Sequence, residues 1–316
     1  MKAKRIIRFT LIGFVSIIVI SVLGMLVWAR TGTYPARAVA LSALESTDRV
    51  TITQDKWIVF TPGEETETGL IFYPGGLVEP TAYAPILRKI AEEGVLVVIT
   101  PMPLKLAILD TGAANAVIDE YPHISTWILA GHSLGGASAA IFAENNPTRI
   151  DAIAFWDSYP PDSADLSDNA MSALSVFGTT NDSPNTDNLN DKRHLLPANT
   201  VFVGIEGASH AQFGDYGPQK GDVVASISLT EQHQQVVPDD RCVCHDRVEC
   251  GLVAGHHFDG NLEEPNRGPV IDAGHQLVVA RLPRLEVCVP HSYEGLVVIL
   301  PGSRVAGGSH AEKAAF

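Results

Sequence analysis

The sequence predicts an α/β fold, a mainly parallel, doubly wound sheet preceded by one N-terminal transmembrane helix. Three observations support this prediction. Short apolar runs alternate with segments of helical spacing over residues 50–237, which is the order of a parallel sheet with helices on both faces. One of these runs, residues 127–130, leads through a glycine-rich turn into a helix. The first thirty residues are a basic end followed by one long apolar stretch.

The N-terminal stretch has the length of a membrane span. Four lysine and arginine residues lie within the first eight positions, and an apolar run follows over residues 9–29. About twenty apolar residues cross a bilayer as a helix. We therefore predict a single-pass anchor in residues 1–30, with the basic end in the cytoplasm and the rest of the chain on the extracytoplasmic side. A cleaved signal peptide is the alternative, although its apolar core is usually shorter.

The remaining chain divides into three parts. We expect a linker over residues 31–49, an α/β domain over residues 50–237, and an atypical extension over residues 238–316. A chain of 316 residues is long enough for one large domain with a sizeable core. The net charge of -14 argues against nucleic-acid binding, which needs a basic face.

The elements of the α/β domain follow from periodicity. The continuous apolar run 95–99 is typical of a parallel strand that is covered on both faces. Residues 81–93 have apolar positions at helical spacing, and Ser228 with Glu231 forms a capping box before the last helix. Strands are expected at 50–53, 57–60, 70–73, 95–99, 127–130, 152–156, 173–177 and 201–205, and helices at 38–44, 81–93, within 106–120, at 136–145 and from 228.

The glycine-rich turn carries a candidate nucleophile. Residues 131–135, Gly-His-Ser-Leu-Gly, fit G-x-S-x-G between a strand and a helix, which is the context that the motif requires. In such a turn the serine is exposed above the sheet edge, beside the helix N-terminus where negative charge is favoured. Ser133 is therefore the predicted nucleophile. The alternative is a helix N-cap serine in an ordinary turn.

A serine nucleophile needs a base, and the base needs an orienting acid. On this type of fold the chain order is serine, acid, histidine. Two later strand-end loops provide Asp182 and then His210, which we predict as acid and base. Asp187 and Asp157 remain alternative acids. His132 precedes the serine directly, so its side chain points away from Ser133, and we expect it to have a packing or supporting role.

The predicted oxyanion hole uses two backbone N–H groups. One belongs to the residue after the nucleophile, Leu134, and the other to the loop after the third strand. That loop reads Pro-Gly-Gly-Leu over residues 74–77, and its glycines allow close approach of a ligand. We choose Gly76 as the second donor and Leu77 as the alternative. An ordinary turn is the competing interpretation.

Three segments resemble α/β-hydrolases, of the compact kind near dienelactone hydrolases: residues 73–76, 131–136 and 209–217. The resemblance covers about residues 50–237. It implies a triad of Ser133, Asp182 and His210 that hydrolyses an ester, lactone or related acyl bond of a small molecule through an acyl-enzyme, without a cofactor. Pro74 is a departure, because many relatives carry histidine there. A non-catalytic binding module with the same pocket is the alternative function.

The C-terminal extension does not fit this pattern. All four cysteines and six of the eleven histidines lie after residue 237. Their spacing matches no standard zinc site, so no metal is expected, and disulfides remain conceivable outside the cytoplasm. We interpret residues 238–316 as a poorly ordered extension, consistent with an altered reading frame joined to a normal domain.

Overall fold

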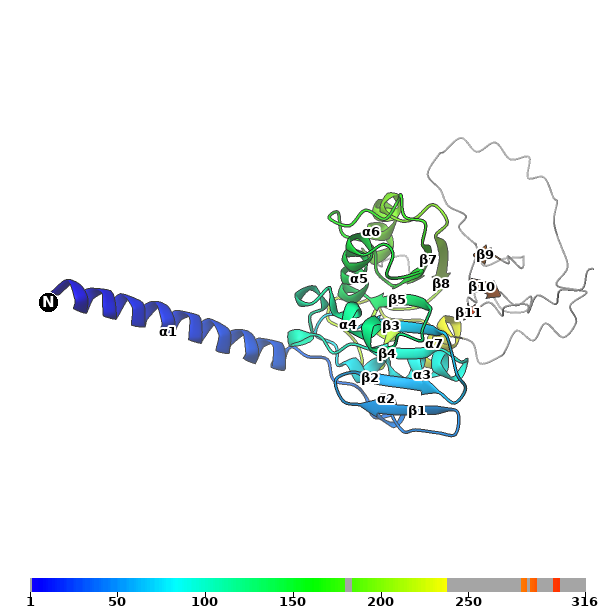
Figure 1. The fold of residues 1–316 in the computed structure, drawn as a ribbon, viewed down its shortest axis with the longest axis horizontal. Helices are drawn as coiled ribbons and strands as arrows, with labels where there is room; N and C mark the ends of the chain where they lie inside the picture. The colour runs from blue at the N-terminus through cyan, green and yellow to red at the C-terminus, as the bar shows by residue number, and fades with distance from the viewer. Residues whose placement is uncertain (1, 180–183, 238–279, 283–284, 289–297, 302–316) are drawn as a thin grey trace, which may run out of the picture.

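The computed structural model describes residues 2–179, 184–237, 280–282, 285–288 and 298–301 (Figure 1). It confirms the predicted mainly parallel α/β fold. Eight strands form one sheet in the order β1-β2-β4-β3-β5-β6-β7-β8. The strands are β1 (Val50–Gln54), β2 (Ile58–Pro62), β3 (Thr68–Tyr73), β4 (Leu96–Ile99), β5 (Thr126–His132), β6 (Ala152–Trp156), β7 (Ser172–Gly178) and β8 (Val201–Ile205).

Strand direction decides where the functional loops meet. β1 is antiparallel to β2, and β2 is antiparallel to β4. The other six strands, β4 to β3 and on to β8, pair in parallel. Their carboxyl ends therefore share one edge of the sheet, where ligands bind in open α/β folds. The loops after β3, β5, β6 and β8 carry the residues discussed below.

Helices cover both faces of the sheet. They are α2 (Ala38–Ser42), α3 (Ala84–Glu92), α4 (Ala113–Glu120), α5 (Leu134–Asn145), α6 (Pro184–Lys192) and α7 (Leu229–Val236). Single turns of 3₁₀-helix are η1 (Pro80–Tyr83), η2 (Pro103–Lys105), η3 (Ala107–Leu109), η4 (Arg193–Leu195) and η5 (Ala211–Phe213). The polar helix α6 was not predicted, because its sequence has no apolar stripe.

Two apolar clusters fill the space between the sheet and its helices. Along β3, Leu70 and Phe72 belong to one cluster, and Ile71 and Tyr73 belong to the other, because successive strand residues face opposite sides. Helices α3 and α7 contribute to the first cluster and α4 and α5 to the second. Burial on both faces explains why the central strands read as continuous apolar runs.

The N-terminal helix α1 (Lys2–Thr31) extends away from the α/β domain (Figure 1). Over Phe9–Thr31 it is long and apolar enough to cross a membrane, and it is the single such helix in the described part of the chain. Either a membrane anchor or a signal sequence has these properties. Within residues 238–316 the structure describes three short antiparallel strands, β9 (Ala280–Leu282), β10 (Leu285–Cys288) and β11 (Val298–Pro301).

Candidate active site

The turn between β5 and α5 holds Ser133 in a strained conformation. Its φ of 52° and ψ of -123° lie in a region that non-glycine residues rarely adopt. A Cβ on Gly131 would lie 2.5 Å from the Gly135 carbonyl carbon, and one on Gly135 would lie 2.0 Å from the Tyr73 oxygen. The motif glycines are therefore required because backbone segments pass too closely for any side chain. Two hydrogen bonds hold the turn: Ser133 N–H donates to the Trp156 carbonyl (3.1 Å), and the Ser158 hydroxyl donates to the Ser133 carbonyl (2.6 Å).

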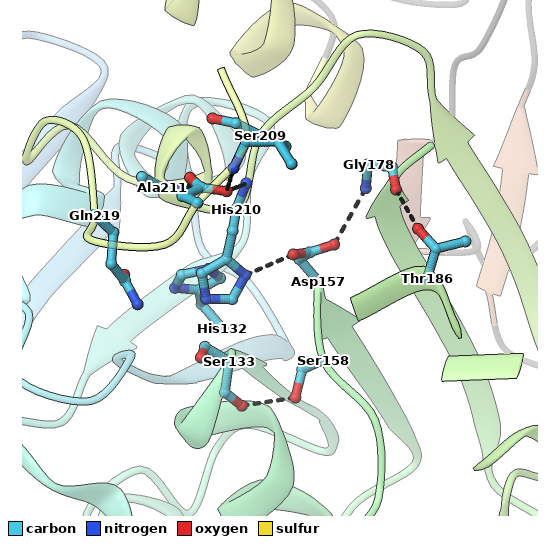
Figure 2. Close-up of polar contacts among 12 residues, drawn as sticks. His132, Ser133, Asp157, Ser158, Gly178, Thr186, Ser209, His210, Ala211 and Gln219 are labelled. Atoms are coloured by element: carbon cyan, nitrogen blue, oxygen red, sulfur yellow. Dashed lines mark hydrogen bonds and ion pairs between the residues drawn. The ribbon is translucent and has the colours of Figure 1, made fainter. Parts of the chain in front are cut away.

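His210 forms a close pair with Asp157 (Figure 2). The His210 Nδ1 and the Asp157 Oδ2 are 2.5 Å apart, and the Asp157 side chain is 1% exposed. The other carboxylate oxygen of Asp157 accepts a hydrogen bond from Gly178 N–H at 3.2 Å. With its Nδ1–H donated to the carboxylate, a neutral His210 presents Nε2 as an acceptor. This is the orientation that a general base requires.

The three aspartates considered as acids therefore have different outcomes. Asp182, the predicted acid, lies outside the described residues. Asp187 is exposed on the first turn of α6. Asp157 directly follows β6, which lies between β7 and β5, the strand that leads to Ser133. Its carboxylate lies next to His210 Nδ1. Whether the carboxylate next to the histidine follows β6 or β7 depends on how the strands and loops pack, which the order of residues in the chain does not reveal.

The loop of His210 is fixed by two residues that the sequence did not single out. The buried Gln232 side chain pairs with the Ser209 backbone, accepting from its N–H (3.1 Å) and donating to its carbonyl (3.0 Å). The Asp222 carboxylate accepts from the backbone N–H groups of His210 (3.2 Å) and Ala211 (2.7 Å). Both partners are distant in sequence and match no local motif, so only the folded chain identifies them.

His132 lies fully buried beside His210. The two rings are 4.4 Å apart between centroids, and Figure 2 draws them side by side. Burial, and then the charge of a protonated His210, lower the pKa of His132 well below its usual value, and an interaction with the His210 backbone opposes them in part. His132 is therefore neutral and packs against His210; its supporting role stays a prediction.

A buried tyrosine links His132 to the loop after β3. The Tyr83 hydroxyl accepts from Gly75 N–H (3.0 Å) and lies 2.9 Å from His132 Nδ1. Burial raises the pKa of Tyr83, so the phenol stays protonated and donates to a neutral His132 Nδ1. A Cβ on Gly75 would lie 2.8 Å from both partner atoms. The first glycine of this loop is thus required by the Tyr83–His132 pair.

The two residues predicted to form the oxyanion hole lie against each other. A Cβ placed on Gly76 would be 3.1 Å from Leu134 Cδ2 and 3.5 Å from Leu134 Cβ. Leu134 is the first residue of α5, where the N–H groups have no partner within the helix. Leu77 N–H already donates to the Lys105 carbonyl at 2.8 Å. Among the described residues the Gly76 N–H has no such partner, so Gly76 is the better second donor.

The described residues contain no group of three or more His, Cys, Asp or Glu side chains arranged to hold a metal ion. Cys242, Cys244 and Cys250 lie outside the described residues, and Cys288 ends β10.

Comparison with known proteins points to one family. The model of the alpha/beta hydrolase family matches residues 69–234, slightly more than half of the chain. Similar solved structures include TT1662 from Thermus thermophilus (16% identity, 52% of this chain and 91% of that chain, TM-score 0.41). A carboxylesterase from Mesorhizobium loti (18%, 50% and 90%, 0.39) and Est1E from Butyrivibrio proteoclasticus (13%, 58% and 94%, 0.42) are also similar. No curated protein sequence matches the chain.

Proposed function

Because the chain belongs to the α/β-hydrolase family, we propose that it is a serine hydrolase with Ser133 as nucleophile, His210 as base and Asp157 as acid. The observation that carries this proposal is the 2.5 Å contact of His210 Nδ1 with a carboxylate that is 1% exposed. A buried carboxylate next to a histidine, at the sheet edge that also carries a strained serine turn, is an arrangement for activating a hydroxyl.

The placement of Ser133 and His210 in one site supports their cooperation (Figure 2). The ring of His132, the residue before Ser133, packs on His210. His210 Nε2 takes the proton of the Ser133 hydroxyl as its oxygen attacks the acyl carbon, and then returns that proton to the leaving alcohol. Water hydrolyses the resulting acyl-enzyme by the same route. Asp157 fixes the histidine tautomer and stabilises its cation.

Negative charge that develops on the substrate oxygen needs donors that are already in place. The N–H groups of Leu134 and Gly76 fill this role, because Gly76 lies against Leu134. The substrate class that fits is a small-molecule ester, lactone or related acyl compound. Phe9–Thr31 anchors the enzyme in the membrane, with the catalytic domain on the extracytoplasmic side, as the basic N-terminus favours.

A fluorophosphonate probe tests the proposal, because it labels only an activated serine. We expect covalent labelling and ester hydrolysis with the full chain, and neither with Ser133→Ala. Ser125→Ala is the matched control, since Ser125 is exposed and precedes β5 at the opposite edge of the sheet. A folded chain that binds an acyl compound without labelling or turnover would instead be the non-catalytic binding module.

A further inference from the structure

The end of helix α1 is joined directly to the loop over residues 74–77, which we call the oxyanion loop because it carries the proposed donor Gly76. Three residues after α1 ends at Thr31, Tyr34 N–H donates to the Leu77 carbonyl (2.7 Å), and Glu79 N–H donates to the Tyr34 carbonyl (3.0 Å). Three residue steps span at most about 11 Å, whereas a domain of about 200 residues is roughly 40 Å across. If α1 spans a membrane, the oxyanion loop therefore lies at the side of the domain nearest the bilayer.

The last turn of α1 is packed on the domain, so the connection is not a loose tether. Ala29 is buried, and its carbonyl accepts from the Thr33 hydroxyl at 2.7 Å. A Cβ on Gly32 would meet the Trp28 carbonyl oxygen at 3.0 Å and Leu77 Cδ1 at 3.3 Å. The helix end thus contacts the same loop that supplies an oxyanion donor, and the orientation of the helix sets the orientation of the site.

Exposed apolar side chains lie close in sequence to the residues of this junction and of the site. Outside α1, the described residues expose five large apolar side chains: Val39, Leu41, Ile108, Leu109 and Val224. Each follows, by seven positions or fewer, a residue that is hydrogen-bonded to the oxyanion loop or to the backbone of His210: Tyr34, Lys105 and Asp222. Turn η3, which carries Ile108 and Leu109, also contacts α5, the helix that begins after Ser133.

Two ion pairs lie at the junction. Glu79 lies 3.3 Å from Lys105, and Asp215 lies 3.7 Å from Arg37. Three exposed glutamates instead occupy the β2–β3 turn, at the opposite edge of the sheet: Glu64, Glu65 and Glu67. Anionic lipid headgroups would repel that edge. Apolar groups next to the anchor and acidic groups far from it favour one orientation on a membrane.

We propose that the mouth of the active site faces the bilayer surface and that the substrates are amphiphilic esters that partition into the membrane. This inference rests on the proposed hydrolase function. Ile108 and Leu109 insert among the lipid headgroups beside the site, and an acyl chain passes from the bilayer to Ser133 without crossing water. Transfer of these side chains into an apolar environment is favourable in itself, and it keeps the mouth against the lipid.

The test uses the full chain in phosphatidylcholine vesicles and two nitrophenyl esters. The butyrate ester dissolves in water and reports the amount of active, accessible enzyme. The palmitate ester resides in the bilayer. The measured quantity is the ratio of the palmitate rate to the butyrate rate, which corrects for folding and orientation in each sample.

Two variants separate the site from the bilayer. One inserts a flexible Gly/Ser segment of about 20 residues between Thr31 and Gly32, which adds roughly 25 Å of reach. The other combines Ile108→Ser with Leu109→Ser. We expect each variant to lower the ratio by about tenfold. The free energy that corresponds to this change is less than that of fully burying one such side chain. Glu64→Ser with Glu65→Ser is the control and should leave the ratio unchanged, because phosphatidylcholine carries no net charge that would repel these glutamates.

Equal ratios in all variants, with butyrate hydrolysis intact and dependent on Ser133, would overturn the membrane-facing site and leave the hydrolase standing. If the wild-type chain hydrolyses neither ester, or if Ser133→Ala does not change the rates, the hydrolase function is overturned and the inference with it. The two failures are thus distinguished by the butyrate rate alone.

Discussion

Ser133 and Asp157 each follow a buried parallel strand, and both have positive φ, 52° and 44°. The chain holds them by different means. The turn of Ser133 is enforced by its own glycines, because any side chain at Gly131 or Gly135 would meet backbone at 2.0–2.5 Å. Asp157 is held by the next strand along, where its N–H donates to the Val176 carbonyl (2.7 Å) and its carboxylate accepts from Gly178 N–H. The local sequence motif thus identifies the proposed nucleophile, whereas contacts with the neighbouring strand identify the proposed acid.

The largest expected effect comes from removing Ser133 or His210, which we propose act as one catalytic unit. Ser133→Ala and His210→Ala should each lower kcat by about 10⁶, because neither residue works without the other. The double variant should be little worse than either single variant. The measurement is steady-state ester hydrolysis, with circular dichroism as the control for folding. Losses that multiply in the double variant would show that the two residues act independently.

The second prediction concerns the acid, which we propose is Asp157 and which the sequence placed at Asp182. Asp157→Asn should lower turnover by about 10⁴, since an amide stabilises the wrong tautomer of the histidine. The matched control is Asp187→Asn, an exposed position on α6, which should keep normal activity. Asp182→Asn should also keep it, because Asp157 already occupies His210 Nδ1. Normal turnover with Asp157→Asn and loss with Asp182→Asn would restore the acid predicted from sequence.

The sequence predicted the features that depend on neighbouring residues in the chain, and it left open the acid, which depends on neighbouring strands. The G-x-S-x-G turn, the strand before it and the helix after it are local, and the residues at 131–136 indicate all three. Eight strands were predicted near their observed positions, because each is a short apolar run. The pairing of Asp157 with His210 joins residues 53 positions apart, and it requires β6 to lie next to β5. A single sequence does not show which strands lie next to each other.

The third prediction breaks the nucleophile turn by its backbone alone. Gly135→Ala should destabilise the chain by more than about 4 kcal/mol or prevent folding, because the new Cβ would lie 2.0 Å from the Tyr73 carbonyl oxygen. Gly112→Ala is the matched control. Its φ is -83°, and its nearest neighbours lie 4.0 Å away, so its effect should stay within about 1 kcal/mol. Urea unfolding of the full chain in detergent measures both.

The fourth prediction uses pH to lower the stability of the part of the fold around α7, which holds the loop of His210. His233 lies on α7 beside Gln232, which holds Ser209, and burial lowers its pKa to about 4. As the pH falls, the unfolded chain binds a proton on His233 before the folded chain does. The contribution of neutral His233 to stability is therefore full above about pH 6.5 and is lost as the pH falls toward about 4.

The loss from His233 amounts to up to about 3 kcal/mol in the free energy of unfolding. His132 acts in the same direction, since its pKa is also lowered. Unfolding curves at pH 7 and pH 4.5 measure the change. His233→Gln should reduce the difference between the two curves, because an amide carries no titrating proton. An unchanged difference would show that His233 does not contribute to the acid sensitivity.

The smallest expected effect concerns Tyr83, which connects the two regions. Its hydroxyl bonds Gly75 N–H in the oxyanion loop and His132 Nδ1 beneath His210. Tyr83→Phe leaves the buried Gly75 N–H without a partner and should cost about 1–3 kcal/mol of stability. We expect kcat to fall about tenfold with little change in KM, because both the oxyanion donor and the base lose support used in the transition state.

Tyr121→Phe is the matched control for Tyr83→Phe, since Tyr121 is partly exposed and lies before β5, at the opposite edge of the sheet. It should leave both kcat and stability nearly unchanged. A purely structural role for Tyr83 would lower stability and leave kcat per folded molecule intact. A role in positioning lowers kcat in samples whose folded fraction is measured and equal. The second result would show that the locally determined turn and the distantly assembled base are aligned through a single buried hydroxyl.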